Sequence, residues 1–102
     1  MRTPSFPNVT VVGMHFLGEY AKAAVESMEP GCALQLEREP DNRFDSFAIK
    51  VLYNNQHIGY LEARQACFIA PWMDEGNEFD VEVTSLEQRK NNLHPIVNVM
   101  PV

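Results

Sequence analysis

The stretch REPDNRFDSFAIKV, residues 38–51, decides the fold of this chain because a polar, proline-broken loop runs directly into a strand-like segment. The loop carries an amide, several carboxylates, two guanidinium groups and an aromatic ring. A simple connector would consist of small turn-forming residues, whereas loops on a rigid scaffold are where binding chemistry concentrates. The stretch therefore predicts a binding loop leading into a buried strand.

Strand-like segments surround this loop on both sides. Residues 32–37 alternate in polarity and predict a strand that enters the loop, and residues 47–53 predict the strand that leaves it. An asparagine-rich turn at 54–56 follows, since Asn tolerates left-handed backbone conformations. A further strand at 57–61 completes a hairpin.

Two segments have helical periodicity. Residues 17–28 place their apolar side chains on one face, and Pro30–Gly31 ends this helix. Residues 62–74 are also predicted to be helical, with Pro71 expected to break or kink the second half.

Three more strands complete the predicted fold. Residues 9–16 form the first, with Gly13 marking a bulge or a close backbone approach. Residues 78–86 alternate strongly, a polar hairpin loop follows at 88–92, and residues 96–100 form the last strand. Six short strands and two helices in this order predict an α+β domain built on a small OB-like antiparallel β-barrel.

Length and charge set the broad class. The 102 residues suit one domain, with residues 1–7 as a flexible lead-in and residues 8–102 as the folded unit. The net charge of −6 argues against non-specific binding of long nucleic acids. The N-terminus lacks the apolar region of a signal peptide, and no apolar run is long enough to span a membrane, so we expect a cytoplasmic protein.

Metal-dependent and nucleophilic catalysis are weakly supported. The acidic residues near the loop lack the spacing of a calcium-binding loop; they are Glu37, Glu39, Asp41 and Asp45. The cysteines, Cys32 and Cys67, lie in apolar stretches and are interpreted as buried hydrophobic residues. Neither lies near any of the three scattered histidines, of which His57 is expected to be exposed and His94 to lie in a loop. We therefore expect no catalytic residues, no metal and no cofactor.

Two aromatic residues accompany polar groups. Phe16 ends the first predicted strand, and Phe44 lies within the polar loop. An aromatic residue in such a loop either covers the core or is exposed as a stacking platform, and the residue pattern alone favours the core position. Exposed aromatic residues on small barrels bind unpaired bases, with each stack contributing about 1–3 kcal/mol.

These residues resemble the HIRAN domain family. The resemblance rests on VGMHF at 12–16, REPDNRFD at 38–45, AIKV at 48–51 and IGYL at 58–61. The family has an OB-like barrel and occurs at the N-terminus of DNA-remodelling helicases and as standalone bacterial and phage proteins. In helicase-associated members it captures the 3′-hydroxyl end of single-stranded DNA, which implies a role in DNA repair or processing.

The resemblance also implies a set of binding residues. Phe16 and Phe44 match the aromatic positions that sandwich the terminal bases. Asp45 matches the carboxylate that accepts the 3′-hydroxyl, and Asn42 is expected to hydrogen-bond the terminal nucleotide.

Other positions depart from the family pattern. His15 stands where a basic residue contacts phosphate, and Tyr60 occupies another polar position. The lysine position corresponds to Ala63, so that Arg64, one residue further on, is the expected substitute. Phenylalanine also replaces tyrosine at both aromatic positions, which retains stacking but removes two hydroxyl groups.

A purely structural role for the loop remains open beside the binding role. Arg38, Asn42 and Asp45 are able to tie the loop together, since Asn and Asp cap turns and Arg pairs with carboxylates. The leading interpretation is a non-catalytic module for single-stranded DNA ends that acts with a separate helicase or nuclease. The alternative is a protein–protein interaction module that has lost DNA binding.

Overall fold

The computed structural model describes residues 2–102, in which six strands, two α-helices and one short 3₁₀ helix are found. The strands are β1 (Phe6–Val12), β2 (Ala33–Arg38), β3 (Ile49–Tyr53), β4 (Gln56–Leu61), β5 (Phe79–Arg89) and β6 (Asn92–Pro101). The helices are the 3₁₀ helix η1 (Met14–Phe16), α1 (Glu19–Glu26) and α2 (Ala63–Asp74).

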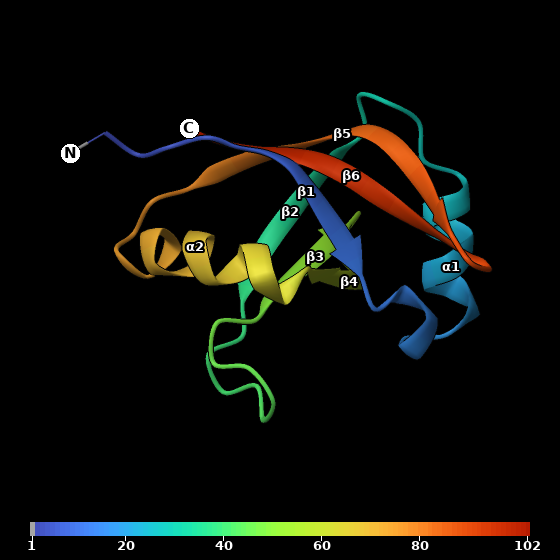
Figure 1. Cartoon of the computed structure of the whole chain (residues 1–102), viewed down its shortest axis with the longest axis horizontal. Coiled ribbons are helices and arrows are strands. Elements are labelled where there is room, and N and C mark those ends of the chain that lie inside the picture. Colours follow the sequence, from blue (N-terminus) through green and yellow to red (C-terminus); the bar gives the residue numbers. More distant parts are fainter. Residues whose placement is uncertain (1) are drawn as a thin grey trace.

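Antiparallel pairing joins the six strands into a closed barrel in the order β1-β4-β3-β2-β5-β6. The barrel closes through β1, which pairs with β4 at Val11 and Leu61 and with β6 at Val9 and Val97. Closure satisfies the strand edges that an open sheet would expose. Helices α1 and α2 lie on opposite sides of the strands (Figure 1). The predicted α+β fold with an OB-like barrel is confirmed.

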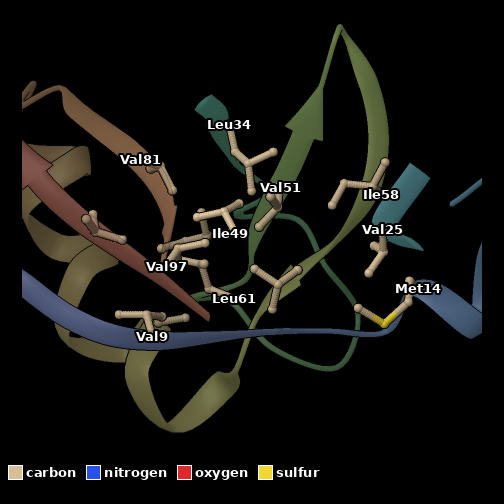
Figure 2. Packing of buried hydrophobic residues seen from close by; sticks show 14 of the residues in the cluster. Val9, Met14, Val25, Leu34, Ile49, Val51, Ile58, Leu61, Val81 and Val97 are labelled. Carbon is tan, nitrogen blue, oxygen red and sulfur yellow. The ribbon is translucent and has the colours of Figure 1, made fainter. Parts of the chain in front are cut away.

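The core is a single apolar cluster inside this barrel. Inward-facing residues of strands that are not neighbours in the barrel, such as Ile49 and Val51 of β3 and Val97 of β6, are fully buried and lie close together (Figure 2). Helix α1 contributes Val25 to the same cluster, and η1 contributes Met14. The core therefore fixes the positions of the elements that border the polar loop.

The first strand begins and ends earlier than predicted. It starts at Phe6, inside the expected lead-in, because Phe6 pairs with Val99 and packs edge-on against Phe79 with ring centroids 6.1 Å apart. It ends at Val12, since Gly13 adopts a left-handed conformation with φ of 85° and starts η1. Phe16, the expected end of this strand, therefore lies in a 3₁₀ turn.

The two β-hairpins are tighter than the sequence predicts. Asn54 and Asn55 both adopt positive φ, which confirms the expected turn. Strands β5 and β6 extend to Arg89 and Asn92, so most of the expected loop at 88–92 is strand. His94, expected in a loop, is a buried residue of β6, with Nδ1 3.0 Å from the carbonyl oxygen of Val11. The hydrogen-bonded pairing of β5 with β6 along their whole length outweighs the local polarity of this segment.

Helix α2 continues through Pro71, where a break or kink was predicted, and ends at Asp74. Proline removes one backbone hydrogen bond from a helix interior. The buried side chains of Ala66, Ile69 and Ala70 pack α2 on the core and stabilise the helix despite this loss. No helix within residues 2–102 is both long and apolar enough to cross a membrane.

Gly59 lies on β4 close to the backbone of its neighbour β1, and we predict that Gly59→Ala destabilises the barrel. A Cβ atom at this position would lie 2.7 Å from the carbonyl oxygen of Val12 and 2.9 Å from Cγ1 of Val11. Overpacking of this kind costs about 1–3 kcal/mol. Urea denaturation should show a free energy of unfolding lowered by that amount. Gln56→Ala, an exposed change in the same strand, should alter it by less than about 0.5 kcal/mol; equal effects would contradict the prediction.

Candidate functional site

The loop between β2 and β3 is closed at its base by the guanidinium group of Arg38. Nη1 donates to the carbonyl oxygen of Ala48 (2.7 Å) and Nη2 to that of Ser46 (2.9 Å). Nε and Nη2 also donate to the two carboxylate oxygens of Asp74, at 2.8 and 3.2 Å. These bonds lower the pKa of Asp74 and tie the loop to the end of α2.

Side chains of the loop cap its own turns. Asn42 Oδ1 accepts hydrogen bonds from the amides of Phe44 (2.9 Å) and Asp45 (3.0 Å). Asp45 Oδ1 accepts one from the amide of Phe47 (2.9 Å). The expected structural role of Arg38, Asn42 and Asp45 is thus confirmed. Among residues 2–102, no donor is found for Asp45 Oδ2, so this oxygen is available to a ligand.

Glu39 is the polar centre beneath the loop. Its Oε1 accepts hydrogen bonds from Asn42 Nδ2 (2.6 Å) and the Tyr60 hydroxyl (2.9 Å), and its Oε2 lies 3.2 Å from Lys50 Nζ. The Asn42 bond is the main cause of a lowered pKa for Glu39. Burial, followed by the bond to Glu39, raises the pKa of Tyr60. Glu37 lies 3.6 Å from the same ammonium group, so Lys50 is balanced by two carboxylates.

The two candidate aromatic residues project into solvent. The side chain of Phe44 is 96% exposed and that of Phe16 is 82% exposed. The core position that the sequence pattern favoured for Phe44 is therefore wrong, because the hydrogen-bonded loop holds its tip away from the barrel. The loop and η1, which carry the two rings, extend from the same side of the barrel in Figure 1. The ring of His15 lies against that of Phe16, with centroids 4.0 Å apart.

A shallow groove of about 230 Å³ runs between the loop, β4 and the start of α2. It brings together four of the predicted residues, namely Asn42, Phe44, Asp45 and Tyr60. The structure does not bring Arg64 to this groove: Arg64 lines a separate groove beside Phe68. His15 and Phe16 are not part of the groove lining either and stand on η1.

Sequence reasoning missed the apolar wall of the groove and the packing of His57 against Tyr60. Val12, Leu61 and Ala63 line the wall; the first two lie at strand ends, which sequence patterns locate poorly. His57, expected to be exposed, is half-buried and packs edge-on against Tyr60 with ring centroids 4.8 Å apart. Its burial lowers its pKa. The pairing of β3 with β4 shifts register between Val51 and Leu52, which leaves an extra residue on β4 between His57 and Gly59 and places both rings on one side. The sequence signal for this bulge is Gly59, a glycine inside a strand.

The acidic residues of the loop do not assemble into a metal-binding cluster. Within residues 2–102, no group of three or more His, Cys, Asp or Glu side chains has a suitable arrangement. Glu37 and Glu39 both face Lys50 instead.

A small closed barrel with a groove beside a hydrogen-bonded polar loop is typical of a binding domain. Similarity to known proteins identifies the family. Residues 6–98 match the HIRAN domain family, so the chain belongs to this family of DNA-binding modules.

Two solved structures resemble the chain closely. A crystal structure of a protein from Lactobacillus plantarum has 29% identity and a TM-score of 0.77, with 96% of this chain and 95% of that chain covered. The crystal structure of the HIRAN domain of human HLTF has 22% identity and a TM-score of 0.72, with 95% of this chain and 74% of that chain covered. At that identity, the likeness to HLTF shows the shared fold. No curated protein sequence matches the chain.

The charge on Glu39 should make the stability of the domain sensitive to acid. Its pKa in the folded protein lies below the ordinary value of 4.5, so it contributes stability above that pH and loses it as the pH falls further. Glu39→Gln retains an acceptor for Asn42 and Tyr60 but carries no charge. Urea denaturation at neutral pH and below pH 4.5 should show a smaller acid-induced loss of stability in this variant.

Glu37→Gln is the matched control because it changes the more exposed carboxylate beside the same lysine, with 58% of its side chain accessible against 21% for Glu39. This variant should retain the acid sensitivity of the wild type. An unchanged acid response in Glu39→Gln would contradict the assignment.

Proposed function

We propose that this chain is a non-catalytic module that binds the 3′-hydroxyl end of single-stranded DNA during DNA repair or processing. Any ATPase or nuclease activity then belongs to a separate partner. The observation that carries the proposal is a fully exposed Phe44 ring beside a groove containing the free oxygen of Asp45.

Stacking is the first element of the proposed interaction. Phe16 and Phe44 offer open aromatic surfaces on two segments that project from the same side of the barrel. A base can cover the exposed ring of Phe44 directly, whereas the ring of Phe16 already has that of His15 against it. Each stack is worth about 1–3 kcal/mol and is independent of base identity. The module is therefore expected to bind with little sequence preference.

Recognition of the end is the second element. Asp45 Oδ2 can accept a hydrogen bond from a terminal 3′-hydroxyl, whereas a 3′-phosphate would place like charges together. Asn42 Nδ2 has a second N–H beyond the one donated to Glu39, and it can donate to the terminal nucleotide. The Tyr60 hydroxyl, which donates to Glu39, retains its lone pairs for the ligand.

Phosphate contacts contribute less in this proposal. Lys50 is balanced by Glu37 and Glu39, and Arg64 lines another groove, so Arg64 falls outside the proposed contact set. His15, exposed beside Phe16, is the proposed phosphate contact on η1. With few cations involved, we expect the affinity to fall only gently with salt. The slope of log affinity against log salt concentration should be about −0.7 for each phosphate contacted.

Asp45→Asn tests recognition of the end. The substitution retains Oδ1 as acceptor for the Phe47 amide but removes the negative charge. Fluorescence anisotropy at low salt should show that the wild type prefers a short strand with a 3′-hydroxyl over the same strand with a 3′-phosphate by about tenfold or more. In Asp45→Asn, this ratio should approach one.

Asp80→Asn is the charge-matched control, because Asp80 is an exposed residue of β5 away from the loop. It should preserve the preference of the wild type. Equal binding of both strands by the wild-type protein would contradict recognition of the hydroxyl.

Phe44→Ala tests stacking separately. Loss of the ring should weaken binding of a short single strand by about 1–3 kcal/mol, with little change in stability since the side chain is exposed. Phe68→Ala, which removes a ring that is 67% exposed on α2, is the matched control and should bind like the wild type. If both variants bind with wild-type affinity, stacking on Phe44 is wrong.

A second candidate function follows from the groove that Phe68 lines. This groove also includes Phe6, Pro7 and Val9 and is mostly apolar, which favours a protein-interaction module that has lost DNA binding. The same titration separates the two: no binding of either strand at low salt, where phosphate contacts are strongest, would favour this alternative.

A further inference from the structure

Phe44 lines two hollows of the loop, here called inner and outer. The inner one is the groove that contains Asp45 and Tyr60. The outer one, of about 300 Å³, is lined by Glu39, Asp41, Asn42, Arg43 and Phe44. Because the ring is 96% exposed, both of its faces are open to a ligand.

Arg43 is the loop's available cation. It is exposed, and no carboxylate within residues 2–102 forms an ion pair with it. The neighbouring cations are engaged, since Arg38 binds Asp74 and Lys50 is shared by two glutamates. A phosphate that reaches this side of the loop would therefore meet Arg43 without competition from an existing ion pair.

We propose that the outer face of Phe44 and the guanidinium of Arg43 form a second nucleotide subsite, which holds the penultimate nucleotide of a bound strand. The proposal rests on the proposed function. With the terminal base on the inner face of Phe44, the next base stacks on the outer face. The linking phosphate then passes the ring edge, beside the residue that precedes Phe44 in the chain.

The carboxylate of Asp41 works against this subsite. It lines the same hollow and has no ion-pair partner within residues 2–102. Its charge repels the phosphate that Arg43 attracts. Asp41→Asn should therefore strengthen binding, in the opposite direction to loss of Arg43.

The first test compares Arg43→Gln with Lys22→Gln, which removes the same charge from α1. Anisotropy titrations of a 3′-hydroxyl oligonucleotide across a salt series should show about fivefold weaker binding for Arg43→Gln at low salt. Its logarithmic salt slope should be shallower by about 0.7, as expected for one lost phosphate contact. Lys22→Gln should retain the affinity and slope of the wild type.

The second test locates the contacted phosphate. A set of 3′-hydroxyl oligonucleotides, each with one neutral methylphosphonate linkage, is titrated into both proteins. In the wild type, neutralising the linkage nearest the 3′ end should weaken binding about as much as Arg43→Gln does. In Arg43→Gln, the same modification should cost nothing further, because the contact is already absent.

The outcomes separate this proposal from the one it rests on. If the wild type binds the 3′ end through Asp45 but methylphosphonate and Arg43→Gln effects are additive at every linkage, the subsite is wrong and the proposed function stands. If the wild type binds no single strand at low salt, both are overturned.

Discussion

The guanidinium group of Arg38 is the contact on which the rest of the site depends. Four hydrogen bonds connect it to two carbonyl groups of the following loop and to the carboxylate at the end of α2. A loop of this polarity cannot enter the core. Without such bonds, nothing would offset the conformational entropy that the loop loses when it adopts a single conformation. With them, the loop is an extension of the barrel, and its side chains have defined directions.

Loop geometry then accounts for the exposure of Phe44. Asn42 accepts hydrogen bonds from two backbone amides, and Asp45 accepts one from a third. The backbone at the tip therefore turns outward with these amide groups satisfied. The ring consequently gains no burial, which is unusual for a phenylalanine. The structural role leaves room for the proposed binding role in the same residues, because Asp45 caps the turn with one oxygen and has no donor within residues 2–102 for the other. Hydrogen bonding of the loop thus supplies the preorganisation that the proposed, weakly basic site would require.

Much of the fold was predictable because barrel strands alternate in polarity and turns use characteristic residues. The errors lie where tertiary contacts outweigh local signals. Phe6 joins β1 through its partners on β5 and β6, and Gly13 ends the strand by adopting positive φ. Pro71 remains inside α2 because the flanking residues are buried. Of these, only the end of the strand at Gly13 has a local signature, because glycine adopts positive φ readily.

The sequence by itself determined the order of the strands and α-helices, which follows from periodicity. It also determined the residue types of the polar loop and the resemblance of its motifs to a known family. Only the tertiary structure decided how those residues meet. It grouped Asn42, Phe44, Asp45 and Tyr60 around one groove and placed Arg64 in another. It also paired Lys50 with two glutamates and left Arg43 unpaired within residues 2–102. The physical reason is that charge pairing and exposure depend on distances between strands, which strand register sets and local sequence does not encode.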